Sequence, residues 1–588
     1  MSAPAAAGGA EPHGGAIVAD AIRAHGVTTL FTLIGGHVSP ILTAAEARGI
    51  AVVDVRDEAT AAFAADAYAR LSGVPGVAVV TAGPGVTNVI TALKNAQLAQ
   101  SPLVLIGGAT ATILKGRGAL QDIDQRALVT PHVKWAAFVT RVRDLGPAVD
   151  RAFREARSGV PGPVFVECPV DLLYPEGVVR EMFLAGMKAP RSFGERAVQW
   201  YLRRHLSRVF AGSDATSARR PAPPRQVHLS PLSLEPIRRA ITASRRPVAV
   251  VGSQAVAAGA DAGSVARALG TLGVPVYLSG MARGLLGADH PLQFRHKRRE
   301  ALREADLVLL CGTPCDFRLD YGRHIGGRAT LVSINLSRDD ATRNRRPAIA
   351  TIAPPDRVLA ALAQQMPAQP DRASWFSMLR SREAMRDGEI TERAALVTAA
   401  GTLNPLAVCR AIDRRLPDDA ILVADGGDFV ATASYTVRPR GALSWLDPGV
   451  FGTLGVGAGF VLGAHAARPS APLVAVYGDG AFGFSLADID TWVKQRVPVV
   501  AIVGNDGRWA QIARDQVAIL GSAVGTVLGR TAYHAVADGL GALGLVVTDP
   551  ASLDDALVQA LAVARTGRPV VVNVHIGETD FRQGSLSL

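Results

Sequence analysis

Short apolar runs alternate with longer amphipathic segments along most of the chain. In the first part, the apolar runs are residues 30–34, 51–55, 76–80 and 102–106. The segments between them repeat apolar positions at helical spacing, over residues 16–23, 58–70 and 88–98. Apolar runs of this length are typical of strands that are buried on both faces. The alternation therefore predicts a parallel sheet with helices on both sides.

The same alternation returns in two later parts of the chain. Its apolar runs are residues 247–251, 274–278, 307–310 and 329–334, and then residues 473–477 and 497–503. The predicted fold class is α/β, with three doubly wound parallel-sheet domains. The predicted order is a disordered lead (1–14), a first domain (15–186), an insert with a linker (187–226), a central domain (227–366), a second linker (367–402), a third domain (403–576) and a tail (577–588).

Residues 187–226 interrupt the alternation of helix and strand. Within them, residues 195–210 combine apolar side chains, including Trp200 and Tyr201, with several arginines, which predicts a basic amphipathic helix. Such a helix can lie on an anionic membrane, or it can pack on the protein's own surface or at a subunit interface. We favour the packed helix, and membrane contact is the less favoured interpretation.

Composition narrows the class of protein. The 588 residues are 48% hydrophobic and 19% charged, as in a large α/β enzyme, and no apolar run is long enough for a spanning helix. The lead lacks the basic and apolar regions of a signal peptide. Four scattered cysteines indicate reduced thiols and a cytoplasmic location. The net charge of +11 is spread along the chain, so we expect a small anionic ligand and no nucleic-acid partner, with solubility alone as the alternative explanation of the charge.

Two apolar runs of the last part end in residues that suit a metal ion and a phosphate. One leads into Gly478-Asp479-Gly480, and the other leads into Asn505-Asp506 after an interval of 24 residues. Parallel strands that end side by side would bring the carboxylates of Asp479 and Asp506 to one ion. Such oxygens suit Mg²⁺, and glycines let backbone N–H groups approach a phosphate. Two unrelated turns after two strands remain the alternative.

This arrangement resembles the cofactor-binding motif of the thiamine diphosphate (ThDP) enzymes. The family pattern has a second asparagine where this chain has Asp506, a change that keeps an oxygen ligand. The resemblance implies a Mg²⁺ ion held by Asp479, Asp506 and the backbone carbonyl of Arg508. It also implies that the first domain binds the pyrimidine of the cofactor and that the third domain binds its diphosphate.

Two further elements fit this family. Glu58 follows the second predicted strand, where the family has the glutamate that bonds N1′ of the aminopyrimidine and promotes its imino tautomer. Leu454 matches the residue that holds the cofactor in its bent form. Taken alone, Glu58 would be a charged helix N-terminus and Leu454 a packing residue. The resemblance assigns cofactor contacts to Glu58, Asp428, Phe429, Gly452, Leu454, Gly478, Gly480, Ala481 and Asn505.

Over its whole length the chain is similar to the acetolactate-synthase-like 2-hydroxyacyl-CoA lyases. The segments that carry this similarity include residues 31–37, 118–121, 280–287, 426–429, 445–448 and 580–585. It implies cleavage of a 2-hydroxyacyl-CoA to formyl-CoA and an aldehyde or ketone, or the reverse acyloin-type condensation. Catalytic roles are then expected for Glu58, for Gln121 near the reacting centre, and for His37 as a proton shuttle. A solvated loop histidine is an equal alternative for His37.

Other functions stay open beside the lyase. An acetolactate synthase, or a related 2-keto-acid carboligase or decarboxylase, shares the cofactor motifs, but residues 505–512 do not reproduce the synthase's tryptophan-containing pocket. A protein that used the fold only for binding or assembly would not be expected to keep Glu58 and Asp479. In the central domain, Arg283 and Arg318 are candidates for the ADP part of CoA or FAD, or for surface packing. The family builds its active site between subunits, which implies a homodimer or homotetramer.

Overall fold

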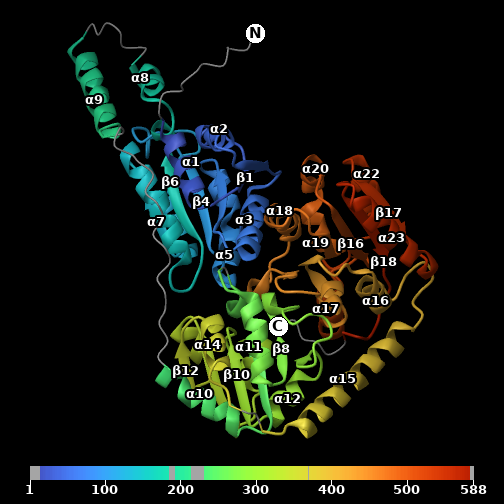
Figure 1. The fold of residues 1–588 in the computed structure, drawn as a ribbon. Helices are drawn as coiled ribbons and strands as arrows, with labels where there is room; N and C mark the ends of the chain where they lie inside the picture. The colour runs from blue at the N-terminus through green and yellow to red at the C-terminus, as the bar shows by residue number, and fades with distance from the viewer. Residues whose placement is uncertain (1–12, 185–191, 213–230, 258, 368–369, 583–588) are drawn as a thin grey trace. The chain divides into compact units, whose positions relative to one another are not determined.

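The computed structural model describes residues 13–184, 192–212, 231–257, 259–367 and 370–582. The chain forms two compact units, one made of residues 1–69 and 74–224 and the other of residues 70–73 and 225–588. One six-stranded sheet lies in the first unit and two lie in the second (Figure 1). The three parallel-sheet α/β domains confirm the predicted fold class.

The first sheet has the strand order β2-β1-β3-β4-β6-β5, and every pair is parallel. Its strands are β1 (Thr29–Leu33), β2 (Ala51–Asp54), β3 (Gly76–Val80), β4 (Leu103–Ala109), β5 (Trp135–Phe138) and β6 (Val164–Pro169). The helices are α1 (Gly14–Ala24), α2 (Ser39–Ala47), α3 (Glu58–Ser72), α4 (Pro84–Asn88), α5 (Ile90–Ala99), α6 (Gln125–Val129), α7 (Leu145–Arg157), α8 (Glu176–Leu184) and α9 (Phe193–Val209). β3, β4 and β6 are buried at every position, which explains their continuous apolar sequences.

The central sheet has the order β12-β11-β10-β7-β8-β9. Its strands are β7 (Pro247–Val251), β8 (Val276–Leu278), β9 (Gln293–Phe294), β10 (Leu307–Cys311), β11 (Thr330–Asn335) and β12 (Ile349–Ile352). The helices are α10 (Pro231–Ala243), α11 (Ala262–Leu272), α12 (Arg298–Glu304), α13 (Arg338–Thr342) and α14 (Pro355–Ala363). The long helix α15 (Ala373–Ala394) occupies most of the predicted second linker.

The third sheet has the order β14-β13-β15-β16-β18-β17. Its strands are β13 (Ile421–Asp425), β14 (Trp445–Leu446), β15 (Leu473–Gly478), β16 (Val499–Asn505), β17 (Leu543–Val547) and β18 (Val570–His575). The helices are α16 (Pro405–Arg415), α17 (Gly427–Thr436), α18 (Gly457–Ala467), α19 (Asp479–Phe482), α20 (Ile489–Lys494), α21 (Ala510–Leu520), α22 (Tyr533–Gly539) and α23 (Leu553–Ala564). β15 and β16 pair in parallel up to Gly478 and Gly504, so their carboxyl ends lie side by side.

Several predicted segments lie partly outside the described residues. This applies to residues 1–12 of the lead, to residues 185–191 and 213–230 around the insert, and to residues 583–588 of the tail. The basic helix expected at 195–210 is α9, and the helix expected at 88–98 is α5, which is preceded by the short helix α4 that ends at Asn88. No helix in the described parts of the chain is long and apolar enough to cross a membrane. The exact domain boundaries remain predictions.

We expect Gly544→Ala to destabilise the third domain. A Cβ at Gly544 in β17 would lie 2.0 Å from the carbonyl oxygen of His534 in α22, so the helix and the strand would have to separate. Overpacking of this kind costs about 1–3 kcal/mol, which a lower melting temperature or faster proteolysis would report. The control is Gly270→Ala in α11, where nothing lies within 4 Å of the added Cβ. Equal melting temperatures for the two variants would contradict the packing described here.

Candidate functional site

In the first unit, one loop borders all three residues for which the sequence predicted catalytic roles. This loop, residues 81–85, leaves the carboxyl end of β3 and includes the first two residues of α4. A Cβ at Gly85 would lie 3.6 Å from Oε1 of Glu58, and a Cβ at Gly83 would lie 2.8 Å from the carbonyl oxygen of Gln121. The hydroxyl of Thr81 is 3.2 Å from Nδ1 of His37. Sequence reasoning thus located three residues that share one neighbourhood of the first unit.

Glu58 is the first residue of α3 and is buried, with 7% of its surface exposed. Its Oε2 accepts a hydrogen bond of 2.9 Å from the side-chain amide of Asn88, at the end of α4. A buried carboxylate at a helix N-terminus is stabilised by the helix dipole as well as by this bond. Asn88 was not predicted, because nothing in the sequence links it to a residue 30 positions earlier.

His37 and Gln121 are both half-buried in loops of the first unit. Burial lowers the pKa of His37, so its imidazole is neutral near pH 7 and can accept or donate a proton. Gln121 has a φ of 61°, a left-handed backbone that is costly for a residue other than glycine. This conformation holds the Gln121 backbone against Gly83, where a side chain would not fit.

A buried polar chain, which the sequence did not predict, fixes the same loop. Gly83 N–H donates to Oε1 of Gln125 over 3.1 Å, and the Gln125 amide nitrogen donates to Oε2 of Glu167 over 2.7 Å. Glu167 is 2% exposed and its charge is matched by an ion pair with Lys115. Buried networks that are satisfied in this way make a loop rigid.

In the second unit, the ends of β15 and β16 bring the two predicted metal-binding carboxylates together. Asp479 is 3% exposed, and its Oδ1 and Oδ2 accept backbone N–H bonds from Gly480 (2.8 Å) and Gly507 (2.7 Å). Asp506 Oδ1 accepts the backbone N–H of Arg508 over 3.2 Å. The side chain of Arg508 forms an ion pair with Glu578.

The electrostatics of this pair favour a bound cation. Burial, and then the nearby charge of Asp479, raise the pKa of Asp506 to about 7. Burial also raises the pKa of Asp479. Two adjacent buried carboxyls are stabilised in their charged forms by a divalent ion, and their oxygens suit Mg²⁺. These residues therefore fit the metal that the motif implies.

Asn505 supplies a further polar atom at this edge. Its amide nitrogen donates to the carbonyl of Thr531 and to Oδ1 of Asn573, both over 3.0 Å. Its own Oδ1 is buried and has no hydrogen-bond partner among the described residues. A buried acceptor without a partner costs about 1–3 kcal/mol, so a bound donor or ion at this position would be favourable. The arrangement fits a bound cofactor.

Leu454 and Ala481 meet at Gly426. A Cβ on Gly426 would lie 2.5 Å from Cδ2 of Leu454 and 2.6 Å from Cβ of Ala481, and its φ of 71° also requires glycine. The loop that carries Leu454 is hydrogen-bonded to the side chain of Asp425, which is fully buried. Its two carboxylate oxygens accept the backbone N–H groups of Gly455 (3.2 Å) and Gly457 (2.8 Å). Asp425 was not among the predicted site residues, although a charged residue at the end of an apolar strand was a usable signal.

The predicted glycines are explained first by packing. A Cβ added at Gly478 would lie 2.9 Å from the carbonyl oxygen of Gly426, and a Cβ added at Gly480 would lie 2.3 Å from the ring of Trp509. Gly452 has a left-handed φ of 67° at the end of a short turn. The backbone N–H groups of both glycines have partners within the fold: Gly478 donates to the carbonyl of Gly426 over 3.2 Å, and Gly480 donates to Asp479 over 2.8 Å.

Asp428 and Phe429 lie in the first turn of α17. Phe429 is 4% exposed, and its ring fills the space beside Gly504, where a Cβ would lie 2.4 Å from it. Asp428 is paired with Arg514 at 3.0 Å and with Arg582 at 3.6 Å, so its negative charge is compensated. A pocket of about 600 Å³ adjoins these residues and includes Asp506 and Arg508 in its wall.

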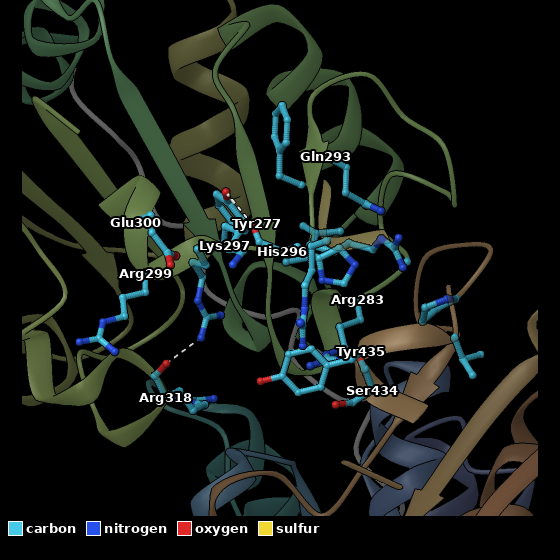
Figure 2. Close-up of a pocket in the computed structure, with 18 of the residues that line it drawn as sticks. Tyr277, Arg283, Gln293, His296, Lys297, Arg299, Glu300, Arg318, Ser434 and Tyr435 are labelled. Atoms are coloured by element: carbon cyan, nitrogen blue, oxygen red, sulfur yellow. Dashed lines mark hydrogen bonds between the residues drawn. The ribbon is translucent and has the colours of Figure 1, made fainter. Parts of the chain in front are cut away.

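A second pocket, of about 660 Å³, lies between the central and third domains within the second unit. Figure 2 shows its labelled basic side chains together with Ser434 and Tyr435, which lie near the carboxyl end of α17. Its charged lining residues are Arg283, Arg295, Lys297, Arg298, Arg299, Glu300, Arg318 and Arg386, a strong excess of positive charge. Burial lowers the pKa of Arg283 and of Arg298, because burial disfavours the charged form of a guanidinium. The pocket is suited to an anionic ligand, and it contains both predicted arginines, Arg283 and Arg318.

His296, Glu383 and Asp387 form another group with metal-ligand geometry, their ligand atoms lying within 4.8 Å of one another. Arg295 already pairs with Glu383 (3.5 Å) and Asp387 (3.2 Å), and His296 bonds Asp387 over 3.1 Å. These bonds satisfy the group without a metal ion.

Three family models match the chain in the order of its domains. They are the N-terminal TPP binding domain of thiamine pyrophosphate enzymes over residues 12–128, their central domain over 234–362, and their C-terminal TPP binding domain over 425–574. Thiamine pyrophosphate is another name for ThDP. A solved ThDP-dependent 4-hydroxybenzoylformate decarboxylase from Rhodococcus jostii has the same fold, with a TM-score of 0.75, 22% identity, and coverage of 97% of this chain and 100% of its own.

Curated relatives match almost the whole chain. The 2-hydroxyacyl-CoA lyase 2 of Danio rerio is 46% identical over 98% of this chain and 93% of its own length, and that of Homo sapiens is 47% identical over 98% and 92%. An acetolactate synthase large subunit from Mycobacterium tuberculosis is 35% identical over 96% and 95%. The chain belongs to the thiamine pyrophosphate enzymes, within the group that contains the 2-hydroxyacyl-CoA lyases. It is a ThDP-dependent carbon–carbon lyase.

We expect Asp425→Asn to weaken ThDP binding, because one acceptor for the Gly455 and Gly457 N–H groups becomes a donor. The loss of about 1–3 kcal/mol corresponds to roughly a 5- to 150-fold higher dissociation constant in a calorimetric titration with Mg²⁺ present. Asp419→Asn, at an exposed position before β13, is the matched control.

The same variant tests the pH dependence of stability. Burial raises the pKa of Asp425 to about 7, so the folded state holds this proton more tightly than the unfolded state. The stabilisation is therefore complete at acid pH and is lost as the pH rises through about 7. The melting temperature of the ligand-free protein should fall less between pH 6 and pH 8 in Asp425→Asn than in the wild type. An unchanged slope would contradict the role of Asp425.

Proposed function

We propose that this protein, loaded with ThDP and Mg²⁺, cleaves 2-hydroxyacyl-CoAs into formyl-CoA and an aldehyde or ketone. The observation that carries this proposal is the near-full-length similarity to 2-hydroxyacyl-CoA lyase 2, in a chain that keeps Glu58, Asp479 and Leu454. The same site can catalyse the reverse condensation, because the cleavage needs no external oxidant or reductant.

The proposed reaction breaks the bond between C1 and C2 of the acyl group. The hydroxyl on C2 loses its proton and becomes the carbonyl of the product, while C1 gains a proton and leaves as the formyl group on CoA. Bound ThDP supplies the chemistry that such a step needs, a carbanion that attacks C1 and a ring that accepts the released electron pair. The protein must place the substrate and move two protons.

Residues around the Thr81–Gly85 loop are assigned to the proton transfers. Glu58 holds the proton at N1′ of the aminopyrimidine, a role supported by its burial and by the Asn88 bond that orients it. His37 exchanges a proton with the substrate hydroxyl, which its neutral state near pH 7 allows. Gln121 donates a hydrogen bond to the reacting carbonyl, and its fixed backbone supports such a positioning role.

In the third domain, Mg²⁺ is assigned to Asp479, Asp506 and the backbone carbonyl of Arg508. Support comes from the two buried carboxyls with raised pKa values at adjacent strand ends. Contacts to the cofactor are assigned to Asp428, Phe429, Gly452, Leu454, Gly478, Gly480, Ala481 and Asn505. For Asp428 and Phe429 we assign the backbone at the start of α17, since one side chain is paired with arginine and the other is buried.

The basic pocket of Figure 2 is assigned to the ADP part of CoA. Its excess of arginine over acidic residues complements the phosphates of CoA, and Tyr435 offers a ring for stacking on adenine. FAD is the alternative ligand, and it would give the purified protein a yellow colour with absorbance near 450 nm. An acetolactate synthase or related carboligase is the second candidate function, favoured by the 35% identity to the mycobacterial synthase.

An assay with ThDP and Mg²⁺ separates the two functions. Formyl-CoA released from a panel of 2-hydroxyacyl-CoAs, identified by mass spectrometry, would support the lyase. Acetolactate formed from pyruvate alone, with no formyl-CoA, would overturn it.

We further propose that the active enzyme is a homodimer or homotetramer in the cytoplasm. Family members build the active site between subunits, and the four cysteines are buried and unpaired, as in a reducing compartment. Sedimentation velocity on the loaded enzyme tests the oligomeric state, and a monomer with full activity would contradict it.

We expect Glu58→Gln to abolish turnover while ThDP and Mg²⁺ still bind. The amide cannot hold the proton at N1′ as a carboxylate does, so kcat should fall at least about 100-fold, the lower range of general acid–base catalysis. Calorimetry should give a ThDP dissociation constant near that of the wild type. The control Glu46→Gln, at an exposed position on α2, should keep full kcat. Wild-type turnover in Glu58→Gln would disprove the assigned role.

We expect Arg299→Gln to raise KM for the acyl-CoA and leave kcat unchanged. Arg299 is an exposed member of the basic pocket, and an exposed ion pair contributes up to about 1 kcal/mol, or about a fivefold effect on KM. The KM of a substrate that has pantetheine in place of CoA should not change, because it lacks the ADP part. Arg357→Gln, on α14 and outside the pocket, is the control. Equal KM changes for both substrates would contradict the assignment.

A further inference from the structure

The carboxyl-terminal half of helix α9 packs into the core of the first unit. Leu206 and Val209 belong to the core of the unit, and Phe210 follows them into it. Nε2 of His205 lies 2.8 Å from the hydroxyl of Thr112, which also bonds Asp171. The carboxyl-terminal half of α9 is therefore held in place by both apolar and polar contacts.

The amino-terminal half carries large apolar side chains that face solvent. Phe193 is 83% exposed, Trp200 62% and Tyr201 48%. Phe193, Ala197 and Trp200 follow one another at helical spacing, on the side of α9 opposite Leu202 and Leu206. The described residues of the chain leave this face uncovered, and Figure 1 shows α9 and α8 at one end of the first unit, beyond its sheet. An exposed tryptophan and phenylalanine on one helix face indicate an interaction surface.

Arginines border this apolar face. Arg196, Arg203, Arg204 and Arg208 are all exposed, and the guanidinium of Arg204 lies 5.4 Å from the centre of the Trp200 ring. The acidic residue of α9 is Glu195, which belongs to the capping box with Ser192 at the helix start. The neighbouring helix α8 adds exposed Met182 (66%) to the same end of the unit. The surface therefore combines exposed apolar side chains with exposed arginines.

The helix is formed before any partner binds. The Ser192 hydroxyl accepts the Glu195 N–H over 3.1 Å, and the Glu195 carboxylate accepts the Ser192 N–H over 3.4 Å. This capping box satisfies two of the helix's free N–H groups. Binding therefore does not have to supply the free energy of folding this segment.

We propose that the outward face of α9 docks on an anionic lipid bilayer, with Phe193 and Trp200 in the headgroup region. Aromatic side chains prefer this region, and each arginine near an anionic surface adds about 1 kcal/mol. The charge pattern argues against a second copy of the chain on this face. A symmetric contact between two α9 helices would bring their four arginines against one another with no acidic counterpart on the face. The proposal does not depend on the proposed reaction.

Vesicle sedimentation with the loaded full-length enzyme tests the proposal, because the readout needs no substrate. The wild type should sediment with phosphatidylcholine vesicles that contain 30% phosphatidylserine and not with pure phosphatidylcholine, and sodium chloride should weaken the binding. Phe193→Ser/Trp200→Ser should remove most of the binding. Arg203→Gln/Arg204→Gln should lower the partition coefficient by about 25-fold, since each arginine supplies about a fivefold effect.

Arg239→Gln/Arg267→Gln, at two exposed arginines of the second unit, is the matched control and should bind as the wild type does. Every variant should keep the wild-type activity and melting temperature, since the substituted side chains are exposed and do not belong to the core of either unit. Vesicle binding that is absent in the wild type, or unchanged in both α9 variants, would overturn the proposal. A loss of oligomer in Phe193→Ser/Trp200→Ser without a loss of vesicle binding would assign this face to a second copy and would also overturn it.

Discussion

The parallel pairing of β15 with β16 is the constraint on which the half of the candidate site around Asp479 and Asp506 depends. The register runs unbroken to Gly478 and Gly504, so the next residues of both strands leave the sheet at one edge. Only in this register does the Asp479 carboxylate reach Gly507 N–H, 28 residues away, over 2.7 Å. A shift by one residue would turn alternate side chains to the opposite face and separate Asp479 from Asp506. Asn505 and the turn at Arg508 are placed by the same pairing.

The sequence was informative wherever structure follows from local pattern. Apolar runs located strands such as β3, β7 and β15, because strands buried on both faces must be apolar throughout. β4 runs on to Ala109, past the predicted end at residue 106, because Gly107 and Gly108 serve packing and do not end the strand. A Cβ at Gly107 would lie 2.6 Å from Phe165, and a Cβ at Gly108 would lie 2.7 Å from Cβ of His37. The two-residue strands β9 and β14 carry no pattern of their own.

The candidate site was predictable as a set of positions but not as a set of contacts. Glu58, Asp479 and Leu454 stand in motifs, whereas Asn88 and Asp425 act through hydrogen bonds that only the folded chain creates. The glycines of the motifs were attributed to phosphate approach, yet the structure gives each a steric reason as well. The ring of Trp509 and the carbonyl of Gly426 occupy the space that side chains at Gly480 and Gly478 would need.

The charge of Asp428 is compensated by arginines from parts of the chain that are distant in sequence. Arg514 comes from α21 and Arg582 from the segment after β18, and together they compensate a carboxylate at the start of α17. The guanidinium of Arg582 also lies over the ring of Tyr435, which lines the basic pocket. A fusion or truncation at the carboxyl terminus that displaced Arg582 would therefore remove one positive charge from this edge and leave Asp428 paired with Arg514. Affinity tags for this enzyme are better attached at the other end of the chain.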